Sequence, residues 1–138
     1  TELCVHRKGA TRAFPAGHPD VPAKYARIGQ PVFIPGDMGR LSYVLVGTEQ
    51  AMKESFGSTC HGAGRVKSRA AAKRALTGQE VLRELESKGI TIKTGNLKDL
   101  AEEASEAYKD ITSVVNVAHN AGISRIVART RPIGVVKG

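Results

Sequence analysis

The feature that most constrains the fold is the alternation of short β-rich runs with capped helical segments. The first 47 residues contain short strands between turns, of which Leu41–Gly47 is the richest in β-branched and aromatic residues. Helical patterns dominate the middle, where Ser68–Leu76 is alanine-rich and Thr77–Glu80 has capping-box spacing. Because no regular strand–helix–strand repeat links these segments, the sequence predicts an α+β fold.

Other elements are predicted from caps, turns and apolar spacing. Strands are expected near Leu3 and Val5 and at residues 90–94, 125–130 and 133–137, and Pro31–Gly39 is expected to be a short strand that enters a turn. Phe14–Pro22, with three prolines and a glycine, is expected to be a loop. Helices are expected at Thr48–Phe56, from Asn96 to about Lys109, and from Asp110 to Gly122. We expect one partial domain over residues 1–138, strand-rich over 1–56 and mixed over 57–138.

Composition narrows the class of partner. The chain has 138 residues, 41% of them hydrophobic, which is enough for one domain with a core. A formal net charge of +8 favours an anionic partner, whereas three Phe, three Tyr and no Trp disfavour an extended aromatic platform for RNA. Two cysteines make no disulfide framework, and no apolar run is long enough for a membrane span, so a cytoplasmic protein is expected.

One glycine-rich stretch carries the clearest chemical signal. Gly57–Arg69 reads "GSTCHGAGRVKSR", with His61 among small residues and basic side chains behind it. Glycines let a ligand approach the main chain, and a helix beginning near Gly64 would direct free amides at an anion. On such a helix Arg65, Arg69 and Lys73 would form a basic stripe.

Several alternatives stay open at this point. The glycine spacing fits neither a Walker A loop nor a dinucleotide fingerprint. His61 could be a surface histidine without chemistry, and the basic stripe could be a solvated helix face. A Cys60–His61 nucleophile pair is disfavoured because adjacent residues of an extended chain point to opposite sides. Zinc binding by Cys4, His6, Cys60 and His61 is disfavoured because their spacing fits no common zinc module.

The glycine-rich stretch resembles the histidine motif of the RtcB family of tRNA-splicing and RNA-repair ligases, especially its archaeal members. Three further stretches resemble the family in the same order: Val5–Gly17 "VHRKGATRAFPAG", Pro31–Thr48 "PVFIPGDMGRLSYVLVGT" and Arg131–Gly138 "RPIGVVKG". The resemblance covers essentially the whole chain. It implies the C-terminal part of the RtcB-type fold, from a longer protein.

The resemblance implies a GTP-dependent RNA ligase with His61 as nucleophile. The imidazole would attack the α-phosphate of GTP and form a covalent histidine–GMP. The guanylate would pass to an RNA 3′-phosphate, and an RNA 5′-hydroxyl would then displace GMP. A 2′,3′-cyclic phosphate would first be opened. Small neighbours give the imidazole access to phosphorus, and the amides of Gly62–Gly64 with Arg65 would stabilise phosphoryl charge.

The same resemblance supplies the remaining site residues. Nucleotide contacts are expected from Pro35, Gly36, Asp37, Met38, Ser42, His61, Gly62, Ala63, Gly64, Tyr108 and Lys137. Contacts to RNA ends or phosphates are expected from Arg7, Lys8, Arg12 and Arg69. The partners implied are RNA, GTP and an activating accessory protein, with no membrane.

The chain departs from the family at the metal site. The family's manganese ligands lie mostly upstream of the matched motifs, and His6, His18 and His119 do not occupy them. We therefore expect no metal site in this chain, and no ligation by the chain alone, because phosphoryl transfer depends on the metal to neutralise charge. Two other interpretations stay open: a nucleotide- or RNA-binding module without catalysis, and a purely structural basic domain.

Overall fold

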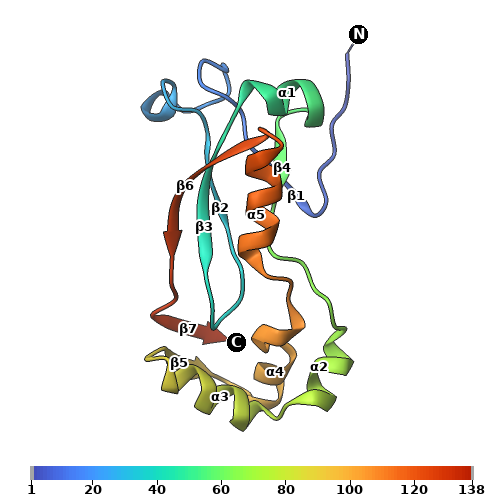
Figure 1. Ribbon diagram of the computed structural model, residues 1–138, viewed down its shortest axis with the longest axis vertical. Helices are drawn as coiled ribbons and strands as arrows, with labels where there is room; N and C mark the ends of the chain where they lie inside the picture. Colours follow the sequence, from blue (N-terminus) through green and yellow to red (C-terminus); the bar gives the residue numbers. More distant parts are fainter. Residues whose placement is uncertain (1, 138) are drawn as a thin grey trace.

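The computed structural model describes residues 2–137, which form a sheet-rich half and a helix-rich half arranged along one long axis (Figure 1). The predicted α+β class is confirmed. In the first half, β3 (Ser42–Gly47) lies between β2 (Pro31–Ile34) and β6 (Ser124–Thr130), antiparallel to both. Helix α5 (Ile111–Asn120) packs on this sheet, where the Tyr43 and Thr112 hydroxyls share a 3.0 Å hydrogen bond.

A two-stranded antiparallel ribbon lies beside this sheet. It pairs β1 (Ala10–Arg12) with β4 (Ser58–Cys60), and β4 follows helix α1 (Glu49–Ser55). The buried hydroxyl of Thr59 in β4 donates to that of Ser124 in β6 over 3.0 Å. This bond fixes β4, and hence the residue that follows it, relative to the larger sheet.

The helix-rich half contains three helices and a parallel strand pair. The helices are α2 (Arg69–Ala75), α3 (Gly78–Ser87) and α4 (Leu97–Glu102). Strands β5 (Thr91–Thr94) and β7 (Gly134–Lys137) pair in parallel, so the end of the chain joins this half. Single 3₁₀ turns occur at Ala23–Tyr25 and Ser105–Ala107.

Each half has its own hydrophobic cluster. The first cluster contains Ala13, Val32, Ile34, Tyr43, Leu45, Ala63, Ile111 and Val115. The second contains Val81, Leu85, Ile90, Leu100 and Ala104. The first draws residues from both sides of position 56, so the strand-rich and mixed regions of the sequence share a core.

Most predicted elements are confirmed, and two are corrected. The Thr48 cap and the Thr77–Glu80 capping box both form. Leu3 and Val5 belong to no strand, and both side chains are exposed, so their alternation has no sheet partner. The helix expected to reach Lys109 ends at Glu102, because the chain turns at buried Ala104.

The turn after Glu102 allows the chain to contact the glycine-rich stretch. The carbonyl oxygen of Ala107 accepts from the amides of Val66 and Lys67 at 2.8 and 3.3 Å. The segment that follows the early end of α4 is thereby connected to the glycine-rich stretch. Over residues 2–137, no helix has the length and apolar character needed to cross a bilayer.

Candidate active site

His61 is the first residue after strand β4, and its side chain is exposed. The preceding Cys60 is half-buried, and burial raises the pKa of its thiol. The imidazole is therefore accessible to a ligand, while the neighbouring thiol is held in its neutral form. This arrangement matches the expectation that adjacent extended residues face opposite sides.

The small residues after His61 are held against the turn that begins at Pro35. The buried Ala63 donates its amide to the Pro35 carbonyl oxygen over 3.1 Å. A Cβ on Gly62 would lie 3.2 Å from the same oxygen, so the loop passes this turn closely. The amide of Ala63 is thus used within the chain and is unavailable to a phosphate, contrary to its predicted role.

The helical segment predicted at Ser68–Leu76 forms as α2, but no helix begins near Gly64, where a basic stripe from Arg65 to Lys73 would require one. Gly64 has φ +69°, a left-handed conformation, and Arg65 forms an antiparallel bridge with Tyr108. Helix α2 begins only at Arg69, where the hydroxyl of Ser68 accepts from the Ala71 amide. His61 is therefore followed by an irregular loop, with no helix terminus directed at it.

Arg65 has every guanidinium nitrogen engaged within the chain. Its Nε donates to the Lys67 carbonyl at 3.1 Å, and one Nη donates to the Glu102 carbonyl at 2.6 Å. The other Nη contacts the Tyr108 hydroxyl at 2.8 Å and the Glu103 carboxylate at 3.4 Å. These contacts brace the loop, and they favour a positioning role over the predicted phosphate contact.

A cavity of about 290 Å³ lies where the two halves of the molecule meet. It is lined by Pro35, Gly36, Asp37, Met38, Ser42, Glu103, Tyr108, Pro132 and Val135. The volume is near the lower limit of about 300 Å³ for small-molecule pockets. The lining includes six of the residues predicted to contact a nucleotide, all brought together from β2–β3 and the Tyr108 segment.

Three lining residues were not predicted from the sequence. Pro132 and Val135 lie in the terminal motif, from which only Lys137 was predicted, and their apolar character beside that motif was a usable signal. Glu103 was missed because it lies within a predicted helix, and nothing in the local pattern distinguishes it from a solvated glutamate.

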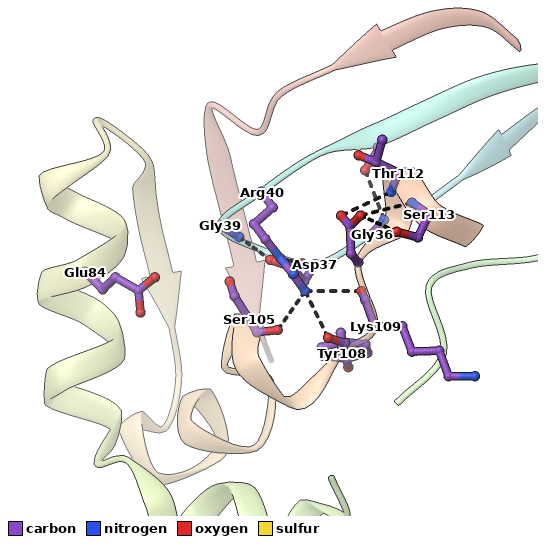
Figure 2. A network of polar contacts seen from close by, with 12 residues as sticks. Gly36, Asp37, Gly39, Arg40, Glu84, Ser105, Tyr108, Lys109, Thr112 and Ser113 are labelled. Carbon is purple, nitrogen blue, oxygen red and sulfur yellow. Dashed lines mark hydrogen bonds and ion pairs between the residues drawn. The ribbon is translucent and has the colours of Figure 1, made fainter. Parts of the chain in front are cut away.

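The turn that lines the cavity is fixed by Asp37 and Arg40 (Figure 2). The Asp37 carboxylate accepts from the Gly39 amide at 3.0 Å and from Arg40 Nε at 2.5 Å. Arg40 also donates to the carbonyl oxygens of Ser105, Tyr108 and Lys109 at 2.8, 3.1 and 3.2 Å. The Asp37 side chain is fully buried, so its carboxylate serves the turn.

Tyr108 forms the opposite wall of the cavity. Its hydroxyl hydrogen-bonds to the Glu103 carboxylate, and the Arg65 guanidinium lies 4.7 Å from the centre of its ring. Burial, followed by the Glu103 contact, raises the pKa of the Tyr108 hydroxyl. The ring is therefore neutral and firmly oriented at the edge of the cavity.

Lys137 lies in strand β7, opposite Thr94 of β5. Alternation along the strand places it on the same face as Val135, which lines the cavity. Its half-buried side chain contributes to lowering the pKa of Glu102, after the larger effect of Lys73. The structure therefore brings Lys137 to the edge of the candidate nucleotide site.

The residues predicted to contact RNA fall into two groups. Arg7 donates to the Ser58 hydroxyl and the Phe56 carbonyl at 2.8 and 2.7 Å, Arg12 donates to Gln30 at 3.2 Å, and Lys8 is exposed beside them. All three lie along the β1–β4 ribbon, near His61. Arg69 lies elsewhere, on α2.

Arg69 and Lys73, the members of the predicted basic stripe that lie on α2, form ion pairs with carboxylates of α4 and of Glu103, which follows it. Arg69 lies 3.5 Å from Glu102 and 3.9 Å from Glu103, and Lys73 pairs with Glu102 and, at 3.6 Å, with Asp99. The Lys73 hydrogen bond lowers the pKa of Glu102, while the Glu102 contact raises that of Lys73. The stripe thus connects two helices, which weakens the expectation that it contacts RNA.

The side chains present do not by themselves fit a metal ion. Within residues 2–137, no three His, Cys, Asp or Glu side chains come together as a metal site. Cys4 and His6 are in contact at 3.2 Å, but both are exposed and Cys60 and His61 do not join them.

The arrangement defines a class of site: an accessible histidine on a small-residue loop that is hydrogen-bonded to the rim of a small-molecule cavity. The chain belongs to the RtcB family, because the family model described as tRNA-splicing ligase RtcB matches residues 1–138. It is 63% identical over 137 residues to the tRNA-splicing ligase RtcB of Archaeoglobus fulgidus, covering 99% of this chain and 28% of that protein.

Two other archaeal relatives support the same family assignment. The proteins of the same name from Thermococcus kodakarensis and Methanococcus maripaludis are 58% identical over 137 residues and 55% identical over 136. Each comparison covers 99% of this chain and 28% of the relative. The chain therefore spans 28% of the length of these three relatives.

Proposed function

We propose that this chain carries the histidine nucleophile and much of the guanine-nucleotide pocket of a GTP-dependent RNA ligase acting in tRNA splicing and RNA repair. The observation that carries the proposal is the hydrogen bond from the Ala63 amide to the Pro35 carbonyl. This bond joins the loop of exposed His61 to the first residue of the cavity wall. A nucleotide with its base in the cavity would then have its phosphates directed toward the imidazole.

The chemistry is a sequence of three transfers. An imidazole nitrogen of His61 attacks the α-phosphorus of GTP, so that a P–N bond forms and the bond to the leaving pyrophosphate breaks. An oxygen of an RNA 3′-phosphate then attacks the same phosphorus, which breaks the P–N bond and restores the histidine. Finally an RNA 5′-hydroxyl attacks the activated 3′-phosphate, GMP leaves, and a phosphodiester bond results.

The residues around His61 have distinct roles in this proposal. The amides of Gly62 and Gly64, which donate to no backbone carbonyl within residues 2–137, are candidates for holding phosphoryl oxygens, since the Ala63 amide is already bonded. Arg65 positions the loop through Tyr108 and Glu103. Tyr108 and Ser42 contact the base, and Lys137 contacts the nucleotide from β7.

The proposed reaction requires manganese, which the side chains of residues 2–137 do not by themselves hold. When bound, the ion would neutralise charge on the phosphoryl oxygens. Its ligands are expected in the additional chain that the longer relatives possess. The RNA ends joined would be a 2′,3′-cyclic phosphate or 3′-phosphate and a 5′-hydroxyl, with an activating protein as a further expected partner.

The test is transfer of label from α-labelled GTP in the presence of manganese. It is applied to this chain and to a chimera in which this chain replaces the matching segment of the longer Archaeoglobus relative. Each is compared with His61→Ala and with the control His119→Ala, which removes an exposed histidine whose Nδ1 accepts from the Ile126 amide.

We expect an acid-labile, alkali-stable label on the chimera that is lost in His61→Ala and kept in His119→Ala. The chain alone should show little or no label and no ligation. Ligation by the chain alone would contradict the assignment of the metal ligands to other segments. A chimera that binds GTP and RNA without label would support the non-catalytic binding module instead.

A further inference from the structure

A stacked pair of rings stands apart from the site described above. Phe14 and His18 lie with ring centroids 3.9 Å apart and planes inclined by 27°. The His18 Nδ1 accepts from the Asp20 amide at 3.2 Å, so in the neutral imidazole Nε2 carries the proton. Both rings are only half-buried, although the chain has just six Phe and Tyr residues in total.

Two arginines lie over the same phenylalanine. The guanidinium carbons of Arg12 and Arg7 lie 4.9 and 5.7 Å from the centre of the Phe14 ring. Arg7 also donates to Ser58, three residues before His61 in the sequence. The ring pair is therefore connected to the β1–β4 ribbon that leads to the candidate nucleophile.

A cationic cavity is lined by Pro15 and Ala16, which lie between the two rings in the sequence. Its volume is about 320 Å³, and its lining includes Pro15, Ala16, Arg27, Thr48 and Arg125. Glu49 is the one carboxylate in this lining, and within residues 2–137 neither arginine forms an ion pair. Arg7, Arg12, Arg40 and Arg65, by contrast, all donate hydrogen bonds within the chain.

An aromatic ring that can accept a stacked base lies here next to two guanidinium groups that form no ion pair within residues 2–137. This combination matches the chemistry of single-stranded nucleic acid. Bases stack on aromatic faces regardless of sequence, and phosphates are bound by arginine. The cavity also contains Ile28, whose side chain is 54% exposed, but two guanidinium groups against one carboxylate favour a polyanion over a folded protein partner.

We propose that the Phe14–His18 ring pair and the Arg27–Arg125 cavity form a binding path for single-stranded RNA. A base stacks on the His18 imidazole, and the flanking phosphates occupy the cavity. The strand then runs along the β1–β4 ribbon, with Arg7 and Arg12, toward His61. This inference rests on the proposed function for the identity of the ligand as RNA, and it adds a site away from the nucleotide cavity.

Stacking is tested by fluorescence anisotropy with a labelled single-stranded oligouridylate and this chain. His18→Ala should weaken binding about five- to a hundredfold, the range measured for loss of one stacked base. His18→Phe should restore most of the affinity, since it keeps a ring. An oligomer of abasic nucleotides should bind the wild type and His18→Ala equally, because only the base contact is lost.

Phosphate binding is tested by the salt dependence of the same affinity. The pair Arg27→Gln with Arg125→Gln should reduce the slope of log K against log salt by about 1.4, because each phosphate contact to single strands contributes about 0.7. The matched control is Arg74→Gln with Arg83→Gln, which removes the same charge from exposed residues of α2 and α3 at the other end of the molecule (Figure 1). The control should leave the slope unchanged.

The inference would be overturned if His18→Ala bound the oligouridylate as tightly as the wild type. It would also be overturned if the two double arginine variants gave equal slopes of log K against log salt, or if the wild type did not bind RNA. Label transfer to His61 in the chimera reads out the proposed function separately. Label without these RNA effects would defeat the inference alone. The RNA effects without label would support this binding path and defeat the proposed catalysis.

Discussion

Arg65 donates to the hydroxyl of Tyr108 over 2.8 Å while its guanidinium lies 4.7 Å from the centre of the same ring. Arg65 belongs to the loop of the candidate nucleophile, and Tyr108 lines the cavity proposed to hold the nucleotide. One side chain thus connects the reacting group to the wall of the pocket. Any change at Arg65 should therefore act on both.

Arg65→Ala should lower the free energy of unfolding by about 2–4 kcal/mol, since it removes the guanidinium from a largely buried carboxylate, which keeps the Tyr108 hydroxyl and the more distant Arg69. The side chains of Arg65 and Glu103 are only 23% and 17% exposed. Urea denaturation followed by circular dichroism measures the change. Arg83→Ala, on the exposed side of α3, is the control and should differ from wild type by about 0.5 kcal/mol or less. Equal stability of the two variants would show that Arg65 braces nothing.

Tyr108→Phe removes the hydroxyl and keeps the ring, so it distinguishes the contribution of the hydroxyl from that of the ring. It removes the bonds to Arg65 and Glu103, so we expect a loss of about 1 kcal/mol in stability. Affinity for GMP, measured by calorimetry on the chimera, should change little because the ring remains. Tyr108→Ala should weaken GMP binding about fivefold or more, as loss of stacking on a base requires. If Tyr108→Phe and Tyr108→Ala weakened GMP binding equally, the hydroxyl and not the ring would be the group that contacts the nucleotide.

The turn at Gly36 has no space for a side chain. A Cβ there would collide with the Leu41 carbonyl oxygen and lie 3.0 Å from a methyl carbon of Ile111. Gly36→Ala should cost about 1–3 kcal/mol, as overpacking does, and should deform the cavity it lines. Gly95→Ala is the matched control, because a Cβ at Gly95 meets no atom within 4 Å. Thermal unfolding of both variants tests this, and similar melting temperatures would refute it.

The helix caps were predictable because each depends on a few adjacent residues. Thr48, Thr77 and Asp110 all cap as their local sequence indicates. The early end of α4 was not predictable, because residues 103–107 have adequate helix propensity. Their conformation is set by the bonds from Val66 and Lys67 to the Ala107 carbonyl, which connect residues some forty positions apart.

Some features of the candidate site were likewise predictable from the sequence and others were not. The cavity lining was largely anticipated through the family resemblance, since Pro35–Met38 and Ser42 lie in one long motif. The positioning role of Arg65 was not predictable, because its partners Glu103 and Tyr108 come from a separate segment of the chain. The basic stripe looked like a ligand surface because sequence periodicity shows which residues share a helix face, but not which carboxylates will face them.

Asp110 gives a prediction of pH dependence. Its carboxylate accepts from the amides of Thr112 and Ser113 and from the Ser113 hydroxyl, and the Ser113 bonds lower its pKa below the ordinary 3.8. A lowered pKa in the folded state means that the stabilisation is fully present above 3.8 and is lost as pH falls through the folded-state value. Asp110→Ala should therefore cost about 1 kcal/mol at neutral pH, as loss of a cap does.

Denaturant unfolding of wild type, Asp110→Ala and Asp110→Asn over a range of pH tests this. The gap between wild type and Asp110→Ala should narrow below pH 3.8, because the protonated acid caps α5 less well than the carboxylate. Asparagine caps without titrating, so Asp110→Asn should stay close to wild type at neutral pH and gain on it in acid. Other acidic groups titrate equally in all three proteins and cancel in the differences. A gap that stays constant through the acid range would mean that ionisation of Asp110 does not contribute to the cap.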